Sequence, residues 1–279
     1  MMAGAVAGFL TVLSAETAPT PASLMTQDSV NVFRRFSIDR AKDLEFYGDV
    51  VGLQALNGLN MPGGGQMSLF HIGTSQFKFT TAGNRVEPSG PVLDVTGLRV
   101  FSYFYADESA VTKAFTSHGY PPPQFAGAAG HRRAMVTDPD GQWVELVVGG
   151  EPSHFEVGAT VSNVERSRAF YREFVGLDEL SPVDGPFGKT WRFKLGNHSA
   201  NILNLWAAHP GATANTYTAG IQYVVNDVDS VDARAKASNV KITQPLGMFG
   251  QGLKTVWLAD PDGITNYFAQ ILRQGPARD

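Results

Sequence analysis

Two Asp-Pro-Asp-Gly turns are each followed by an apolar strand pattern, and the two strands present different functional groups. Glu145 stands four positions after the glycine in TDPDGQWVELVV, and Tyr267 stands at the same distance in ADPDGITNYFAQ. A carboxylate can take up or release a proton, and a phenol can donate a hydrogen bond to a substrate oxygen. Alternation along the first strand places Trp143 and Glu145 on one face and Val144 and Leu146 on the other. This pattern predicts a carboxylate that faces a pocket beside an indole ring.

The first half of the chain offers further polar side chains for such a pocket. Arg34 and Lys78 lie on predicted strands that could share the pocket with Glu145 and Trp143. Arg34 would clamp the carboxylate of a small aromatic ligand, and Glu145 could move a proton. The alternative is an ordinary Glu–Arg pair on a solvated face of the sheet.

The second half predicts a less charged pocket. Glu156 would act there as general base and Tyr267 as hydrogen-bond donor. Asn204 and Gln222 lie on other predicted strands of this half and would bind the substrate. The alternative is that Glu156 and Tyr267 satisfy each other in a filled core.

These candidates lie on a chain that repeats itself. Landmark residues recur at a nearly constant separation, namely Phe46-Tyr47 as Phe170-Tyr171, Gly52-Leu53 as Gly176-Leu177, and the two Asp-Pro-Asp-Gly turns. An internal repeat of roughly 120 residues indicates two copies of one domain. We therefore expect a leader and linker at residues 1–27, a first domain at 28–150 and a second domain at 151–279.

The sequence pattern predicts two consecutive units in each copy. Each unit consists of a strand, a helix and three further strands. In the second copy, the β-branched segment 155–162 is a predicted strand. Asn163 is the predicted N-cap of the helix that follows, and Gly176 is the predicted residue after its C-terminus. A further strand and helix come next, with Asp227 or Asp229 as the N-cap. The chain is thus predicted to contain four such units.

This repeated pattern resembles a known superfamily. The helix motif SNVERSRAFYREFVGL and the closing Asp-Pro-Asp-Gly turns are similar to those of the vicinal oxygen chelate superfamily, which includes glyoxalase I, extradiol dioxygenases and bleomycin-binding proteins. The resemblance covers the chain from about residue 30 to residue 272. It implies an α+β fold in which four βαβββ units form two open-barrel glyoxalase-like domains, each built from two consecutive units. In metal-dependent members, His, Glu or Gln side chains hold a divalent ion in the concave face.

The residues at the corresponding positions form an incomplete set of metal ligands. Three or four ligands are needed to hold a divalent ion, and each domain offers one carboxylate. A divalent metal is therefore not expected at the usual place, and no other cofactor is predicted. The matching positions are Val32, Lys78, Val100 and Glu145 in the first domain and Glu156, Asn204, Gly220 and Tyr267 in the second.

The composition excludes some classes of partner. A net charge of −4 and a pI near 5.9 give no basic excess, so nucleic acid and anionic membranes are poor candidates. The absence of cysteine removes thiol catalysis and thiolate metal sites. The apolar segment 3–15 is too short to span a bilayer but has the length of a signal-peptide core. Export, a cytoplasmic location and a homodimer all remain open.

These features predict a glyoxalase-like enzyme that acts on a small aromatic or oxygenated metabolite by lyase- or isomerase-type proton transfer, without the usual metal. Two alternatives remain. The first is a non-catalytic protein that binds a drug or metabolite in an aromatic-rich pocket. The second is a metal-dependent ring-cleaving dioxygenase that recruits His154, His198 or His209 from outside the usual positions.

Overall fold

The computed structural model describes most of the chain between residues 19 and 272. The described residues are 19–26, 31–36, 40–60, 65–81, 90–150, 154–196, 201–214, 218–250 and 252–272. The side chains of residues 34–36 and 81 lie outside this description. No helix of the described part is long and apolar enough to cross a membrane.

Four units follow one another along the chain, and each opens with a strand and a helix. The first two units contain β1 (Asn31–Phe36), α1 (Arg40–Glu45), η2 (Phe46–Val50), β2 (Gln54–Asn60), β3 (Gln66–Ile72) and β4 (Ser75–Thr81), then β5 (Gly97–Tyr105), α2 (Glu108–Ser117), β6 (Arg132–Thr137) and β7 (Trp143–Val148). The last two contain β8 (Phe155–Val161), α3 (Val164–Ala169), η4 (Phe170–Val175), β9 (Glu179–Gly185), β10 (Gly188–Lys194) and β11 (Asn201–Ala207), then β12 (Ala219–Val224), α4 (Val228–Ala237), β13 (Ile242–Phe249), β14 (Leu253–Ala259) and β15 (Thr265–Ile271). The predicted α+β class with four repeated units is confirmed.

The second unit has two strands after its helix where three were predicted. Residues 120–125, which include Tyr-Pro-Pro-Pro, form no strand, and Ala126 makes an isolated bridge to Arg133. Proline has no backbone N–H to donate to a strand ladder, so three consecutive prolines prevent strand pairing here.

The helix boundaries of the third unit follow the predicted capping residues. The Asn163 side chain accepts a hydrogen bond from the Arg166 backbone N–H at 3.0 Å. Gly176 adopts a left-handed φ of 86° after η4, a conformation that suits glycine because it has no Cβ. Of the two candidate caps in the fourth unit, Asp227 is the N-cap of α4.

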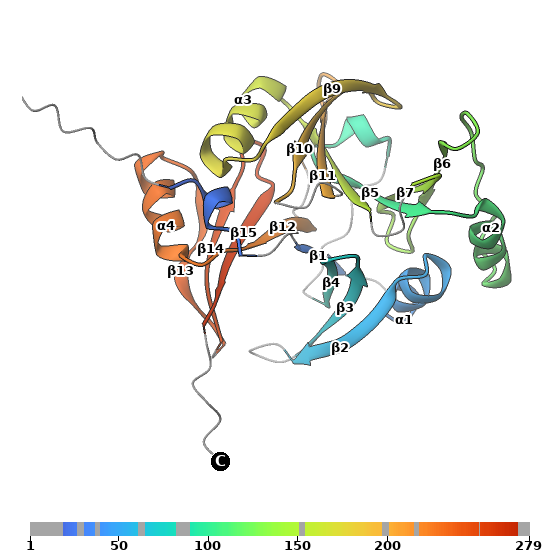
Figure 1. Ribbon diagram of the computed structural model, residues 1–279, viewed down its shortest axis with the longest axis horizontal. Helices are drawn as coiled ribbons and strands as arrows, with labels where there is room; N and C mark the ends of the chain where they lie inside the picture. Colours follow the sequence, from blue (N-terminus) through green and yellow to red (C-terminus); the bar gives the residue numbers. More distant parts are fainter. Residues whose placement is uncertain are drawn as a thin grey trace, which may run out of the picture.

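The strands form two sheets, and each sheet contains strands from both halves of the chain. The eight-stranded sheet has the order β13-β14-β15-β12-β1-β4-β3-β2, and the seven-stranded sheet has the order β6-β7-β5-β8-β11-β10-β9. The junctions are the antiparallel pairs β1–β12 and β5–β8. Figure 1 shows that α1 and α2 lie at one end of the molecule and α3 and α4 at the other, with the sheets running between them. The first unit therefore shares its sheet with the fourth and the second with the third, so the expected pairing of the first with the second and of the third with the fourth is wrong.

The lengths of the connections account for this pairing. The connection between β7 and β8 is short and consists of residues 149–154. The connections between the two sheets are longer and consist of residues 82–96 and 208–218. A short connection keeps sequential elements adjacent, so the second and third units share one sheet. The longer links contact each other through the bridge between Val95 and Thr213.

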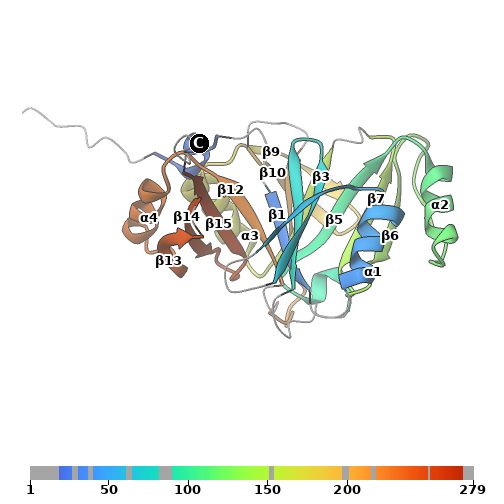
Figure 2. The same cartoon turned by 90° about the horizontal axis from the view of Figure 1, so that it is seen from below.

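The two sheets face each other across one common core. Phe77 of the eight-stranded sheet and Phe101 of the seven-stranded sheet lie with ring centroids 5.2 Å apart in this core. The opposite face of each sheet carries a separate apolar cluster. Figure 2 shows the same arrangement of sheets and helices from below. Each sheet thus presents one face to the common core and one outward face, which we call its cup.

Each half of the chain is also held together by a buried tyrosine–aspartate contact. The Tyr47 hydroxyl donates to Asp138 of the first Asp-Pro-Asp-Gly turn at 2.7 Å, and the Tyr171 hydroxyl donates to Asp260 of the second at 3.2 Å. Burial raises the pKa of Asp260 to about 7. These contacts join consecutive units through their core faces, although the sheets run across the halves. The domain boundary near residue 150 stays a prediction.

Part of the predicted leader belongs to the folded structure. The Thr26 backbone N–H donates to the carbonyl of Val224 at 3.0 Å, and the Asn226 N–H donates to that of Leu24 at 2.8 Å. The short helix η1 (Pro21–Leu24) begins beside Gly176, where a Cβ would come within 2.5 Å of Thr20 Oγ1. Residues 20–26 of the predicted leader and linker therefore pack on the fold, and residues 1–18 lie outside the described residues.

Replacing Tyr47 with phenylalanine tests the contact between the first two units. The loss of a buried hydrogen bond should lower the free energy of unfolding by about 1–2 kcal/mol. Tyr120→Phe, at a half-buried tyrosine whose ring lies 5.4 Å from Phe46, should change it by less than about 0.5 kcal/mol. Denaturant titration measures both, and equal losses would contradict a specific role for the Tyr47 hydroxyl.

Candidate functional site

Two buried glutamates lie in one row of the seven-stranded sheet. Ser102 on β5 is the Cα partner of Glu145 on β7 and of Glu156 on β8. Glu145 is 5% exposed and Glu156 is 7% exposed. Directly paired residues on neighbouring strands project from the same face of a sheet. Since Val144 and Leu146 belong to the common core, the row faces outward into the cup, as alternation along β7 predicted.

Each of the two glutamates has one neutral hydrogen-bond donor and one arginine partner. Glu145 accepts from the Ser102 hydroxyl at 2.8 Å and from Arg133 Nη1 at 2.8 Å. Glu156 accepts from Asn204 Nδ2 at 2.7 Å and lies 3.5 Å from Arg192 Nη2. The arginine side chains are more exposed than the acids, at 43% for Arg133 and 27% for Arg192. We call these six residues the acidic cup.

Aromatic residues close one end of the acidic cup. Trp206 packs over Gly158, where an added Cβ would come within 2.0 Å of the indole. Its Nε1 donates to Thr190 Oγ1 at 2.9 Å, and Phe187 lies 4.8 Å away between ring centroids. Trp143 belongs to the same apolar cluster, and its Nε1 donates to the carbonyl of Gly90 at 3.0 Å.

The segment before β5 covers this aromatic end. The short helix η3 (Val92–Asp94) places Val92 in the cluster with Val100 and Trp206. The Thr160 hydroxyl donates to the carbonyl of Val92 at 3.1 Å and fixes η3 over the sheet. The six polar residues of the acidic cup are thus bordered, beneath η3, by an apolar cluster.

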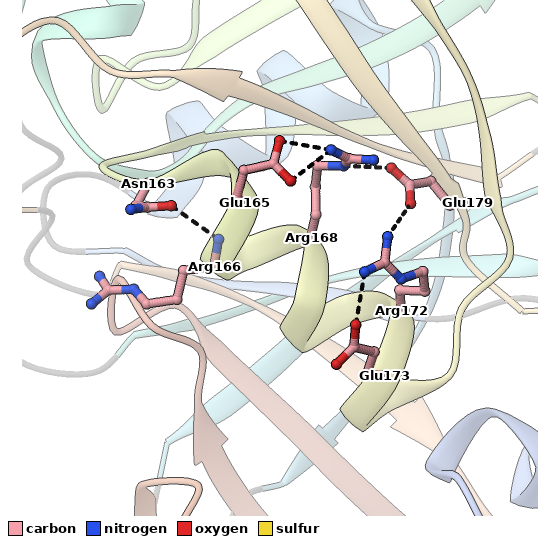
Figure 3. Close-up of polar contacts among 7 residues, drawn as sticks. All are labelled: Asn163, Glu165, Arg166, Arg168, Arg172, Glu173 and Glu179. Carbon is pink, nitrogen blue, oxygen red and sulfur yellow. Dashed lines mark hydrogen bonds and ion pairs between the residues drawn. The ribbon is translucent and has the colours of Figure 1, made fainter.

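An ion-pair network on the third unit anchors one wall of the acidic cup. Figure 3 shows Glu179, at the start of β9, between two arginines of the preceding helix. Glu179 accepts from Arg168 Nε at 2.6 Å and from Arg172 Nη1 at 3.1 Å. Because β9 pairs with β10, this network also restrains the strand that carries Arg192.

The outward face of the eight-stranded sheet forms a second cup with different chemistry. Lys78 Nζ reaches across β1 from β4 and donates to Gln222 Oε1 on β12 at 2.8 Å. Tyr267 pairs with Gln222 across β12 and β15, and its ring lies 4.7 Å from Trp257 and 6.1 Å from Phe33. We call these five residues the basic cup.

Burial shifts the pKa of both titratable groups in the basic cup. Desolvation lowers the pKa of Lys78 from 10.5 to about 8 because it disfavours the charged ammonium. Desolvation raises the pKa of Tyr267 to about 12, against a smaller opposite effect of a hydrogen bond with Thr255. Tyr267 therefore stays a neutral phenol at physiological pH.

The structure regroups the residues that the sequence analysis assigned to two pockets. Glu145 and Trp143 lie in the sheet of Glu156 and not with Lys78, so the first predicted pocket is wrong in its membership. The predicted pairing of Glu156 with Tyr267 and Gln222 is wrong for the same reason, since the second pocket divides between the sheets. The cause is the pairing of β5 with β8, which joins the two halves.

The sequence analysis assigned site positions to two residues of β1, Val32 and Arg34. Val32 lies in the common core, and its neighbour Phe33 faces the basic cup, so the predicted outward position is off by one residue. The Arg34 side chain, predicted to clamp a ligand, lies outside the described residues.

Three residues of the acidic cup were missed. Ser102 lies two residues beyond Val100, so strand alternation could have placed it on the same face. Arg133 and Arg192 gave no comparable signal, because their approach to Glu145 and Glu156 depends on strand pairing across the sheet.

Comparison with protein families agrees with this architecture. Residues 153–268 match the model of the Glyoxalase/Bleomycin resistance protein/Dioxygenase superfamily. The matched segment lies in the second half of the chain, over its third and fourth units. None of the curated proteins matches the chain.

Solved structures with the glyoxalase-like fold extend the comparison to both halves. Glyoxalase I from Zea mays has a TM-score of 0.71 and 20% identity, covering 89% of this chain and 94% of its own. A Bacillus subtilis protein provisionally described as a dioxygenase has a TM-score of 0.65 and 15% identity, covering 89% and 87%. The cppA protein from Streptococcus pneumoniae has a TM-score of 0.53 and 10% identity, covering 88% and 99%. Identities this low establish the shared fold alone.

The glyoxalase-like acidic cup does not fit the metal site of metal-dependent superfamily members. It supplies two carboxylates. Each of them already forms an ion pair with an arginine and accepts a hydrogen bond from a neutral donor. An ion would have to displace both arginines, and a hydroxyl and an amide would have to complete its shell. Among the residues that the structure describes, no three His, Asp or Glu side chains gather in a metal-binding arrangement.

The histidines proposed for an unusual dioxygenase site are not brought together in the described structure. The His154 ring stacks on Phe104 at 4.5 Å. His209 is 61% exposed and lies 2.7 Å from Asp94 Oδ1. His198 lies outside the described residues.

Lys78→Met tests the burial of the ammonium group through its pH dependence. Below pH 8 the folded and unfolded states both carry a charged Lys78, so the full desolvation penalty opposes folding. As pH rises from about 8 to 10.5, the folded state loses the proton first and the penalty is relieved. A shift of this size corresponds to about 3 kcal/mol, so the stability of Lys78→Met relative to wild type should fall by about that amount over this window.

The matched control for this measurement is Lys241→Met, at an exposed lysine. Its stability relative to wild type should stay flat over the same pH range. Unfolding free energies from denaturant titration at several pH values provide the comparison, and parallel curves for the two variants would contradict a buried charged Lys78.

Proposed function

We propose that the acidic cup is a proton-transfer site for a small aromatic or oxygenated metabolite, with lyase- or isomerase-type chemistry. The observation that carries this proposal is the row of Glu145, Ser102 and Glu156, in which two buried carboxylates flank one hydroxyl on a single sheet face. Pairs of positioned carboxylates serve as general base and general acid in many enzymes. The match of residues 153–268 to the Glyoxalase/Bleomycin resistance protein/Dioxygenase superfamily supports a small-molecule site on this face.

Movement of the two arginines would free the glutamates to react with a substrate. Arg133 and Arg192 are the more exposed members of their ion pairs, so an anionic substrate oxygen can draw them away from Glu145 and Glu156. One glutamate, in its ionised form, then removes a proton from the substrate carbon, and the other, in its protonated form, delivers a proton at a second atom, so that the two carboxyl groups exchange protonation states. The arginines compensate the negative charge that develops on the substrate oxygen.

The aromatic end of the cup supports a flat substrate. Trp143, Trp206 and Phe187 form an apolar end beneath η3, next to the charged row. A ring placed there would stack on an indole and direct its oxygen substituents toward the arginines. This arrangement is the reason that we favour an aromatic or conjugated oxygenated compound.

The second candidate function is a non-catalytic small-molecule binder. The observation that favours it is that both glutamates are fully engaged by donors, as in ion pairs that only position side chains. Such a binder would retain its aromatic end and would not depend on the acidity of either carboxyl group.

Deuterium exchange at acidic C–H groups of small aryl ketones tests the proposal. Wild-type protein in D₂O should accelerate exchange of a ketone from such a panel, followed by proton NMR. Glu145→Gln and Glu156→Gln should each reduce the rate by about 10²–10⁴-fold, because a positioned carboxylate contributes a factor of that order. Glu45→Gln, at a glutamate that is 45% exposed on α1, is the matched control and should leave the rate unchanged.

The outcomes separate the two candidates. Ketone binding without exchange in the wild type would favour the binder, and binding is then expected to persist in both variants. Exchange that survives Glu145→Gln and Glu156→Gln would show that neither carboxylate moves the proton.

A further inference from the structure

We propose that the basic cup is a second ligand site, which takes an aromatic carboxylate through an ion pair with Lys78. This site lies on the outward face of the eight-stranded sheet and shares no residue with the acidic cup. The inference therefore goes beyond the proposed proton transfer and does not depend on it.

Lys78 is a buried cation with a single neutral partner in the described structure. Its side chain is 9% exposed, and Gln222 Oε1 accepts one of the three N–H groups of the ammonium at 2.8 Å. No carboxylate of the described residues forms an ion pair with it. By contrast, the more exposed Lys254 and Lys236 each have an aspartate partner at 2.6 Å.

A bound anion would offset the cost of this arrangement. Burying an ammonium without a counter-charge is unfavourable, and the lowered pKa of Lys78 reflects that cost. The two N–H groups that Gln222 does not occupy suit the two oxygens of a carboxylate. Gln222 would keep its own bond and hold the amine in place.

The aromatic residues beside Lys78 define the rest of the ligand. Phe33, Trp257 and Tyr267 form one cluster, and Trp257 is half-buried, so the cluster borders solvent. The Phe33 and Trp257 rings lie 5.5 Å apart and are tilted by 58°. Phe33 is also the direct neighbour of Lys78 on the adjacent strand. A carboxylate at Lys78 would therefore bring an attached ring to this cluster.

The absence of a side chain at Gly220 allows this packing. Gly220 pairs with Phe33 across β1 and β12, and an added Cβ would come within 2.8 Å of the Phe33 ring. The Phe33 ring therefore lies over a backbone position that no other residue type could occupy without a shift. This places the aromatic cluster close to the plane of the sheet, on the face that also carries Lys78.

Calorimetric titration with benzoate tests the proposal, with benzyl alcohol as the uncharged probe of similar shape. Wild-type protein should bind benzoate and should bind benzyl alcohol at least about tenfold more weakly, because a charge-assisted hydrogen bond to a buried amine is lost. Lys78→Met keeps the length of the side chain but removes its charge, and it should weaken benzoate binding by about tenfold or more. Lys241→Met is the matched control and should bind as the wild type does.

The acidic cup also contains arginines, so its variants complete the experiment. Arg133→Met and Arg192→Met should leave benzoate affinity unchanged if Lys78 holds the carboxylate. No benzoate binding by the wild type would overturn the proposal. Equal affinity of wild type and Lys78→Met, or equal affinity for benzoate and benzyl alcohol in the wild type, would overturn it as well.

Discussion

The antiparallel pairing of β5 with β8 is the constraint on which both cups depend. It joins the second and third units into one sheet and places Ser102 opposite Glu156, while β5 and β7 place Ser102 opposite Glu145. The corresponding pairing of β1 with β12 brings Lys78 within reach of Gln222. Without these two junctions, the glutamates would lie in separate sheets and the lysine would lose its partner. The strand pairing therefore determines which charged side chains are in contact, and the identity of each side chain determines its chemistry.

The two sheets carry cups of opposite character on one scaffold. The outward face of the seven-stranded sheet holds two acids, each with an arginine, and the matching face of the eight-stranded sheet holds a lysine beside three aromatic rings. The two cups lie on opposite sides of the common core, so a ligand proposed for one cup would not compete for space with a ligand proposed for the other. This separation of charge follows from side-chain identity at matching strand positions, as with Glu145 and Tyr267.

Much of the fold could be predicted from the sequence, because repetition, strand alternation and capping residues act locally. Alternation correctly placed Val144 in the core and Glu145 in a cup, and Asn163 and Gly176 marked the ends of their helix. The partners of Glu145 could not be predicted in the same way, because pairing between distant strands leaves no periodic signal. The short link at residues 149–154 was the available clue that the second unit pairs with the third.

The absence of cysteine makes this pairing directly testable with engineered disulfides. Ser102 and Glu156 are Cα partners, and such neighbours lie at roughly 4.5–5.5 Å, within the range that a disulfide requires. The double variant Ser102→Cys/Glu156→Cys should therefore oxidise to an intramolecular disulfide, measured by intact mass and thiol titration. The double variant Glu156→Cys/Tyr267→Cys, which would join the two sheets, should stay reduced. A disulfide in the second variant and free thiols in the first would contradict the account.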